Sequence, residues 1–121
     1  MGQNLFTTVD PWTASGDVFV DPGDGETDSQ QLLLAFAQWA WGLLPYSFAA
    51  PTVTYDFDNV MLFTHLDLND FVIGIAFVGG MCNELASASV STANLGAGIS
   101  SVTIAHEMGH NFGMGHDGIG E

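Results

Sequence analysis

The chain has 121 residues, 47% of them apolar, so it is long and hydrophobic enough to bury a core as one small domain. It carries 14 acidic residues and no Lys or Arg, which gives a formal net charge of -14 at pH 7. Such a chain cannot neutralise phosphates or an anionic membrane surface, so we expect no nucleic-acid binding and favour cations and basic peptides as partners.

The N-terminal part is expected to hold short extended segments and a turn. Asn4–Val9 alternates loosely and stops at Asp10-Pro11, which predicts a short strand. Asp17–Val20 is predicted to be a second extended piece before the turn-rich Asp21–Gly25. This acidic turn could suggest a calcium loop, but it lacks the regular ligand spacing of one, so we favour an ordinary solvated turn.

A helix is predicted from Asp28 to Leu44. Thr27-Asp28-Ser29-Gln30 has the form of a capping box, and the charge of Asp28 suits the positive end of a helix dipole. Apolar residues then recur every three or four positions until Pro45 ends the pattern, namely Leu33, Phe36, Ala37, Ala40 and Leu44. The helix also contains two tryptophans that we expect to pack on the core, Trp39 and Trp41.

Three further strands are predicted in the middle of the chain. Asn59–His65 has the composition of a buried strand, Phe71–Val78 is an apolar and β-branched run, and Ala86–Ser91 is a short candidate. Leu66–Asp70 reads as a polar connector, and Thr52–Tyr55 has some extended character. Strands and helices therefore alternate, which predicts an α/β (α+β) fold with helices packed on one mixed, twisted sheet.

The last predicted element is a helix that begins near Ile99 and carries two of the four histidines. Its apolar residues at helical spacing are Val102, Ala105 and Phe112. His106 and His110 are four residues apart, so both imidazoles project from one face and can bind one ion, with Glu107 beside it. Neutral imidazoles in this arrangement favour zinc.

A third zinc ligand is expected from His116, because Gly113 tolerates the left-handed conformation that lets the chain bend back after a helix. Three imidazoles leave a fourth position for a water molecule, whose proton Glu107 could accept and pass to a leaving amine. Chance occurrence of all these residues at these offsets is rare, so the pattern predicts a hydrolase. The negative field of the chain should ease protonation of the histidines and zinc release in acid. His65 is assigned no role.

Residues 106–117, HEMGHNFGMGHD, resemble the zinc signature of the metzincin endopeptidases. Asp117 after the third histidine is typical of their adamalysin/reprolysin branch, which includes the ADAM and snake-venom metalloproteinases. The segments Asp58–Thr64 and Ile73–Cys82 and the helix around Phe36–Pro45 are also similar to that branch. The resemblance therefore runs from about residue 4 to residue 117.

This resemblance implies a zincin-like upper subdomain with an active-site helix and a substrate cleft. A sheet edge would line the cleft and pair with an extended polypeptide substrate; it consists of Ile73, Gly74, Ile75, Ala76, Phe77 and Val78. Alternatively, these apolar residues form only core. The resemblance also implies a secreted or extracellular enzyme, although the chain contains neither a signal-like N-terminus nor a membrane segment.

Parts of the family's catalytic domain have no counterpart, so we treat residues 1–121 as a single, incomplete domain. An N-terminal strand and helix and a C-terminal subdomain with a methionine turn are expected to be missing, because Met108 and Met114 lie inside the zinc motif. A partner segment could supply that subdomain. Cys82 resembles a cysteine whose disulfide partner is absent, and Asp58 a calcium-site residue whose other ligands are absent.

Two functions are compatible with the sequence. The favoured one is a zinc-dependent endopeptidase in which His106, His110 and His116 bind Zn²⁺ and Glu107 is general base and acid. The alternative is a non-catalytic zinc-binding or interaction module, a truncated or recoded member of the same family. The presence of Glu107 favours the enzyme, because a pure binding role has no use for that carboxylate.

Overall fold

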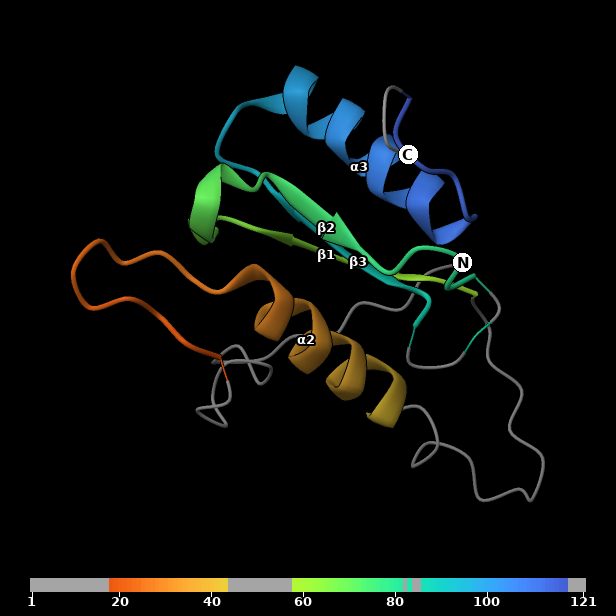
Figure 1. The fold of residues 1–121 in the computed structure, drawn as a ribbon, viewed down its shortest axis with the longest axis horizontal. Coiled ribbons are helices and arrows are strands. Elements are labelled where there is room, and N and C mark those ends of the chain that lie inside the picture. The colour runs from red at the N-terminus through yellow and green to blue at the C-terminus, as the bar shows by residue number, and fades with distance from the viewer. Residues whose placement is uncertain (1–17, 44–57, 82, 84–85, 118–121) are drawn as a thin grey trace.

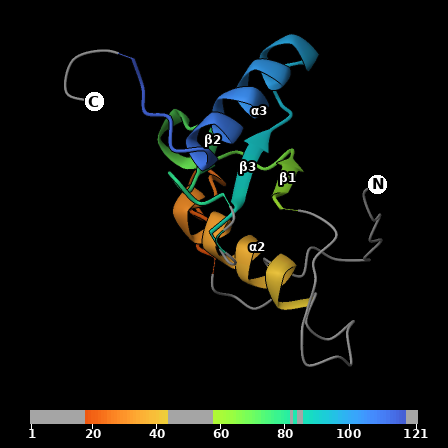
Figure 2. The same cartoon turned by 90° about the vertical axis from the view of Figure 1, so that its right-hand side faces the viewer.

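The computed structural model describes residues 18–43, 58–81, 83 and 86–117. In this part of the chain a sheet lies between two helices, α2 (Ser29–Leu43) and α3 (Ala97–Asn111), which cover its opposite faces (Figures 1 and 2). The predicted α/β fold is therefore confirmed. No helix in these ranges is long and apolar enough to cross a membrane. The predicted strand Asn4–Val9 and the extended piece Thr52–Tyr55 lie outside the described residues.

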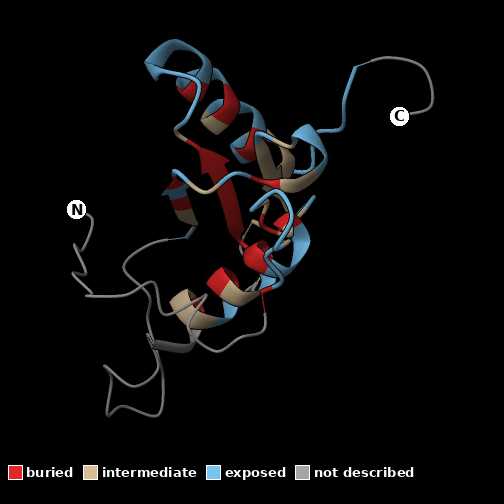
Figure 3. Ribbon diagram, turned by 90° about the vertical axis from the view of Figure 1, so that its left-hand side faces the viewer, coloured by how far each residue is buried: buried red, intermediate tan, exposed pale blue. Residues whose placement is uncertain are grey.

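The sheet is mixed, as predicted. Its middle strand is β3 (Ala88–Thr92), which pairs in parallel with β1 (Val60–Thr64) and antiparallel with β2 (Gly74–Ala76). All five residues of β3 are buried, as the red arrow in Figure 3 shows. The segment predicted as a short final strand is thus the centre of the sheet, and β2 lies at one edge of its described strands.

The apolar core lies between α2 and the sheet. Leu62, Val90 and Ile75 form a row across the three strands on the side of this core. The buried members of the core are Val18, Leu32, Leu33, Phe36, Ala37, Trp41, Leu62, Leu68, Ala88 and Val90. Trp39 packs against them, so the expected packing role of both tryptophans is confirmed.

Helix α2 begins one residue later than the predicted capping box implied. The Asp28 carboxylate, not the Thr27 hydroxyl, caps the helix: its Oδ1 accepts the Gln31 N–H at 2.9 Å. Thr27 is engaged elsewhere, because its N–H donates to the Asp67 carbonyl at 2.7 Å and its carbonyl accepts the Asn69 N–H at 2.9 Å. These two backbone hydrogen bonds hold Thr27 outside the helix, so they fix where the helix starts.

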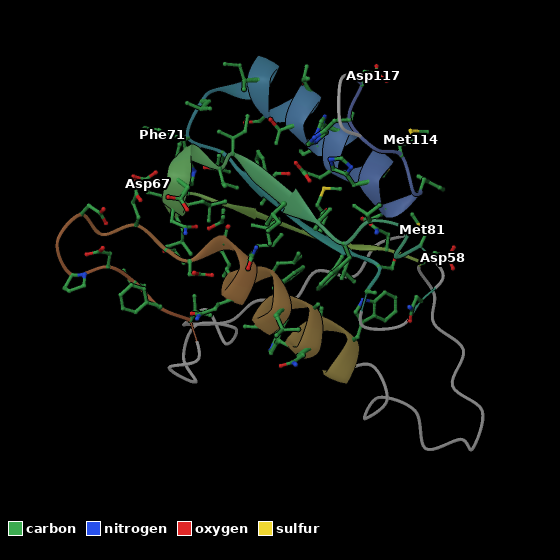
Figure 4. The ribbon with its side chains drawn as sticks, in the orientation of Figure 1. Asp58, Asp67, Phe71, Met81, Met114 and Asp117 are labelled. Atoms are coloured by element: carbon green, nitrogen blue, oxygen red, sulfur yellow. The ribbon has the colours of Figure 1, made fainter. Side chains whose placement is uncertain are left out.

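The predicted strand Phe71–Val78 is too long. Residues Asn69–Phe71 form a 3-10 turn, in which Asp70 and Phe71 have φ angles of 56° and 59°. Two successive left-handed residues cannot continue a strand, so β2 begins only at Gly74. The Phe71 side chain is 97% exposed, at the end of the sheet away from Met81 and Met114 (Figure 4).

Helix α3 covers the other face of the sheet through polar and small side chains. It begins two residues before the predicted Ile99, and its buried residues are Ser100, Thr103, Glu107 and Asn111. Beneath them the sheet presents small residues in cross-strand pairs, Gly74 with Ser91 and Ala76 with Ser89. The apolar residues that indicated the helix are all exposed, since Val102 is 69% and Phe112 62% exposed and Ala105 is exposed as well.

Candidate metal centre

Three histidines meet at the C-terminal end of α3. His106 and His110 stand one turn apart on the helix, and His116 returns to them from the segment that follows. Their Nε2 atoms are separated by 3.0 Å (His106 to His110), 3.0 Å (His106 to His116) and 2.9 Å (His110 to His116). Among the described residues, these three form the one group of His, Cys, Asp and Glu placed to hold a metal ion.

This spacing fits zinc. Nitrogens at the usual Zn–N distance of about 2.0–2.1 Å in a regular tetrahedron are about 3.3–3.4 Å apart. The observed separations of 2.9–3.0 Å are close to this value, so a single ion can contact all three rings. With the ring protons on Nδ1, the three Nε2 atoms would direct lone pairs at one another, and a cation between them would relieve this repulsion. The triad thus has the geometry of an HExxH…H zinc site.

The turn after α3 delivers the third histidine. Gly113 has a φ of 93°, a conformation that L side chains rarely adopt, and its N–H donates to the His110 carbonyl at 2.8 Å. The Met114 N–H donates to the Gly109 carbonyl at 3.0 Å. These bonds fold the chain back onto the end of the helix, so that His116 reaches the other two rings.

A backbone carbonyl fixes the tautomer of His110. Its Nδ1 lies 2.7 Å from the Met114 oxygen, which can only accept a hydrogen bond. Nδ1 therefore carries the proton, and in the neutral ring Nε2 keeps the lone pair that a metal needs. The sequence could not show this contact, because any residue at position 114 offers the same carbonyl.

Glu107 is buried beside the triad, with only 5% of its surface exposed. Burial raises the pKa of its carboxyl above 4.5, and nearby His110 and His116 lower it in part. It packs against Gly74 of β2, where a Cβ atom would lie 2.7 Å from Glu107 Oε1. The sequence predicted Glu107 as the acid–base residue, but not this close approach to the sheet.

The negative charge of the chain does not decide the direction in which the pKa of His106 shifts. We expected easier protonation of the histidines, yet the pKa of His106 is lowered from 6.5, first by loss of solvent contact and then by its neighbours His110 and His116. Both effects disfavour the charged form of the His106 ring: lost solvent contact weakens its solvation, and the two neighbouring imidazoles oppose added positive charge on it.

A pocket of about 570 Å³ lies between α3 and β2 and includes the triad and Glu107. Five of the six residues predicted at the cleft line it: Ile73, Gly74, Ile75, Ala76 and Val78. Phe77 does not line it and packs against the apolar core. The sequence reasoning missed three further lining residues, Val102, Thr103 and Gly115.

Other candidate residues lie apart from this pocket. His65 is exposed, and its Nδ1 is 3.0 Å from Asn94 Oδ1. In the acidic turn, Asp21 Oδ1 accepts the Gly23 N–H at 2.7 Å and Asp24 Oδ1 accepts the Glu26 N–H at 2.9 Å. These carboxylates accept hydrogen bonds from backbone N–H groups of the turn, as expected for the ordinary solvated turn.

Comparison with known proteins also indicates a metallopeptidase. Residues 4–120 match the model of metallo-peptidase family M12. The chain is 38% identical over 96 residues to the human protein "A disintegrin and metalloproteinase with thrombospondin motifs 6". Two proteins of Naja atra are also similar, the zinc metalloproteinase-disintegrin-like atragin (43% over 61 residues) and atrase-A (32% over 106 residues).

These alignments cover 71%, 50% and 88% of this chain, respectively, but only 8%, 10% and 15% of the three relatives. The family match spans almost all 121 residues and includes the histidine triad described above. The chain therefore belongs to the reprolysin branch of metallo-peptidase family M12.

Proposed function

We propose that this chain is the zinc-binding part of an endopeptidase that hydrolyses peptide bonds in polypeptide substrates. One observation carries the proposal: three Nε2 atoms converge within 3.0 Å beside a buried carboxylate, and all four side chains line one pocket. Membership of a peptidase family supports polypeptides as the substrate class. In this proposal His106, His110 and His116 hold Zn²⁺.

Glu107 would be the general base and acid. Zinc held by the three imidazoles would supply a Lewis acid that polarises the scissile carbonyl and acidifies a water molecule. Because burial raises its pKa, Glu107 is a stronger base than a solvated glutamate and also a competent donor once protonated. It could thus accept a proton from water and return it to the leaving amine.

The outer edge of β2 would hold the substrate. The Thr92 N–H donates to the Ile73 carbonyl at 2.9 Å, so Ile73 and, two residues on, Ile75 direct their backbone groups toward β3. The N–H and C=O groups of Gly74 and Ala76 then point away from β3, toward the side of β2 where no other strand pairs among the described residues. An extended peptide could pair with them as an antiparallel strand beside the triad.

Charge and family resemblance extend the proposal to substrate type and location. With 14 acidic residues and no Lys or Arg, the chain would attract basic polypeptides and repel acidic ones.

We also propose that the enzyme acts outside the cell, on the basis of the resemblance to secreted and cell-surface metalloproteinases. The parent protein would be longer, since the chain spans only 8–15% of the relatives compared above.

A second function has one observation in its favour. Val78, Phe112 and Met114 are more than 60% exposed, at 66%, 62% and 64%, near the metal centre. Such apolar exposure fits a surface that contacts another polypeptide, either a segment that completes the catalytic domain or a partner of a non-catalytic zinc module.

Cleavage of a denatured basic protein by the zinc-loaded chain separates the two functions. The matched variant is Glu107→Gln, which keeps the size of the buried side chain and removes its basicity. An endopeptidase should cleave, and the variant should be at least about a hundredfold slower with zinc still bound. If the zinc-loaded wild type and Glu107→Gln both fail to cleave the protein, the result would instead support the non-catalytic binding module.

A further inference from the structure

We propose that Asn111 is a positioning residue of the metal centre, whose side chain fixes the end of α3 against the sheet and thereby places His110 and His116. The inference rests on the zinc site proposed above. Asn111 is 0% exposed and directly follows His110 in the last turn of α3. An amide buried so completely must use its hydrogen-bonding groups inside the protein.

The Asn111 side chain links α3 to both neighbouring strands. Its Nδ2 donates to the Phe77 carbonyl at 2.9 Å and to the Ala88 carbonyl at 3.0 Å. Phe77 directly follows β2 and Ala88 begins β3. On its other side, Asn111 Oδ1 accepts the Asn59 Nδ2 at 2.8 Å, from the residue before β1. One side chain thus connects the metal-bearing helix to three segments of the sheet.

Backbone hydrogen bonds hold the same end of the helix. The last carbonyls of a helix lack partners within it, and here the segment after β2 supplies them. The Gly79 N–H donates to the His110 carbonyl at 2.7 Å, and the Met81 N–H donates to the Asn111 carbonyl at 2.9 Å. The helix end is therefore docked by both its backbone and the Asn111 side chain, so its rotation about the helix axis is restricted.

This restriction matters because the metal ligands tolerate little displacement. The His110 Nε2 must stay close to the Nε2 atoms of His106 and His116, which lie 3.0 and 2.9 Å away, and the His110 carbonyl anchors the Gly113 turn that delivers His116. Functional constellations need their side chains held within about 0.5 Å. The planar amide of Asn111 offers two N–H groups in fixed directions, which an apolar side chain of similar size could not replace.

Zinc affinity tests the inference without any need for activity. Two variants, Asn111→Ala and Asn111→Asp, are compared with Asn94→Ala, at an exposed position that precedes the N-terminal end of α3. We expect the Asn111 variants to bind zinc about 10–100-fold more weakly in competition with a chromophoric chelator, and the control to match wild type. In Asn111→Asp an added negative charge would by itself strengthen zinc binding, so a loss there reports geometry rather than electrostatics.

Cobalt provides a spectroscopic readout that a purely structural role would not change. The visible spectrum of the Co²⁺-loaded Asn111 variants should shift toward that of His116→Ala, because a misplaced turn loses the third imidazole. Circular dichroism establishes that each metal-free variant is folded. Should Asn111→Ala fail to fold, Asn59→Ala removes the donor to Asn111 Oδ1, together with a 3.0 Å hydrogen bond to Ser87 Oγ, and should weaken zinc binding in the same direction by a smaller factor.

Folded Asn111 or Asn59 variants with wild-type zinc affinity and cobalt spectrum would overturn the inference and leave the zinc site intact, even if their melting temperatures fell. A wild-type chain that binds no zinc would refute the proposed metal centre itself, and this inference with it.

Discussion

Glu107 lies directly against Gly74 of β2. A Cβ atom at position 74 would lie 2.7 Å from Glu107 Oε1, 2.8 Å from Glu107 Cγ and 2.7 Å from Thr103 Cγ2. No ordinary Cβ contact is this short, so the buried carboxylate occupies space that any other residue at position 74 would fill. The absence of a side chain on Gly74 therefore determines where the proposed acid–base group stands.

Gly74→Ala should consequently displace Glu107. We expect a loss of about 1–3 kcal/mol in unfolding free energy from overpacking, and a fall in kcat of about a hundredfold if the carboxylate moves by about 1 Å. Zinc affinity should change little, because all three ligands lie on α3 and the turn after it. Cleavage kinetics measure the change in kcat, and competition with a chelator measures zinc affinity.

Gly98→Ala is the matched control for this substitution. A Cβ at position 98 meets nothing within 4 Å, and the residue lies in the first turns of α3. It should stabilise the chain by about 0.5–1 kcal/mol and leave kcat unchanged. A wild-type kcat for Gly74→Ala would show that the small residue is not needed to seat Glu107.

Gly113→Ala should weaken zinc binding through the backbone. At a φ of 93° an alanine is strained by about 1–2 kcal/mol, and relief of this strain would move the turn that brings His116 to the triad. We predict lower stability in urea and roughly tenfold weaker zinc binding. Full zinc affinity in this variant would mean that His116 reaches the ion without the glycine turn.

Glu107→Gln should stabilise the zinc-free chain in a pH-dependent way. Burial raises the folded-state pKa of Glu107 above 4.5, so its favourable contribution is complete below about pH 4.5 and is lost as pH rises through the folded value. A neutral amide avoids this loss. Thermal unfolding should therefore show a higher melting temperature for the variant near pH 8 and little difference near pH 4.

Zinc should be released in acid with a steep pH dependence. Each ligand must be neutral, so protonation of three imidazoles reduces the apparent affinity by up to about a thousandfold per pH unit below about pH 6.5. The lowered pKa of His106 means that this ring resists protonation further into acid than a solvated histidine. Zinc occupancy unchanged at about pH 4 would contradict the ligand set, whereas His65→Ala should leave the profile unaltered.

In the zinc-free chain, the lowered pKa of His106 changes stability with pH in the opposite direction to the raised pKa of Glu107. Because the folded-state pKa of His106 lies below 6.5, the unfolded chain binds more protons there. The contribution of His106 to stability is present above about pH 6.5 and falls as the solution is acidified.

The convergence of the three histidines was predictable because it is local in sequence. His106 and His110 are related by helical geometry alone, and His116 needs only a turn at Gly113. The α2 helix was predictable for the same reason, since its apolar period and its acidic start are both local signals. These features depend on backbone geometry over a few residues, which composition and spacing describe well.

Features that depend on distant segments were not predictable from one sequence. Nothing in Ala86–Ser91 marks it as the central strand, because serines normally indicate exposure and here Ser89 and Ser91 lie beneath a polar helix face. The left-handed Asp70 and Phe71 carried no glycine signal, so the apolar run was read as strand. The links from Asn111 to Phe77 and Ala88 join residues more than twenty positions apart.

X-ray absorption of the zinc-loaded chain, combined with zinc stoichiometry, tests the central claim most directly. We predict one zinc per chain with three imidazole nitrogens at about 2.0–2.1 Å, and the loss of one of them in His116→Ala. A different stoichiometry, or an imidazole count that His116→Ala leaves unchanged, would contradict a metal centre built from His106, His110 and His116.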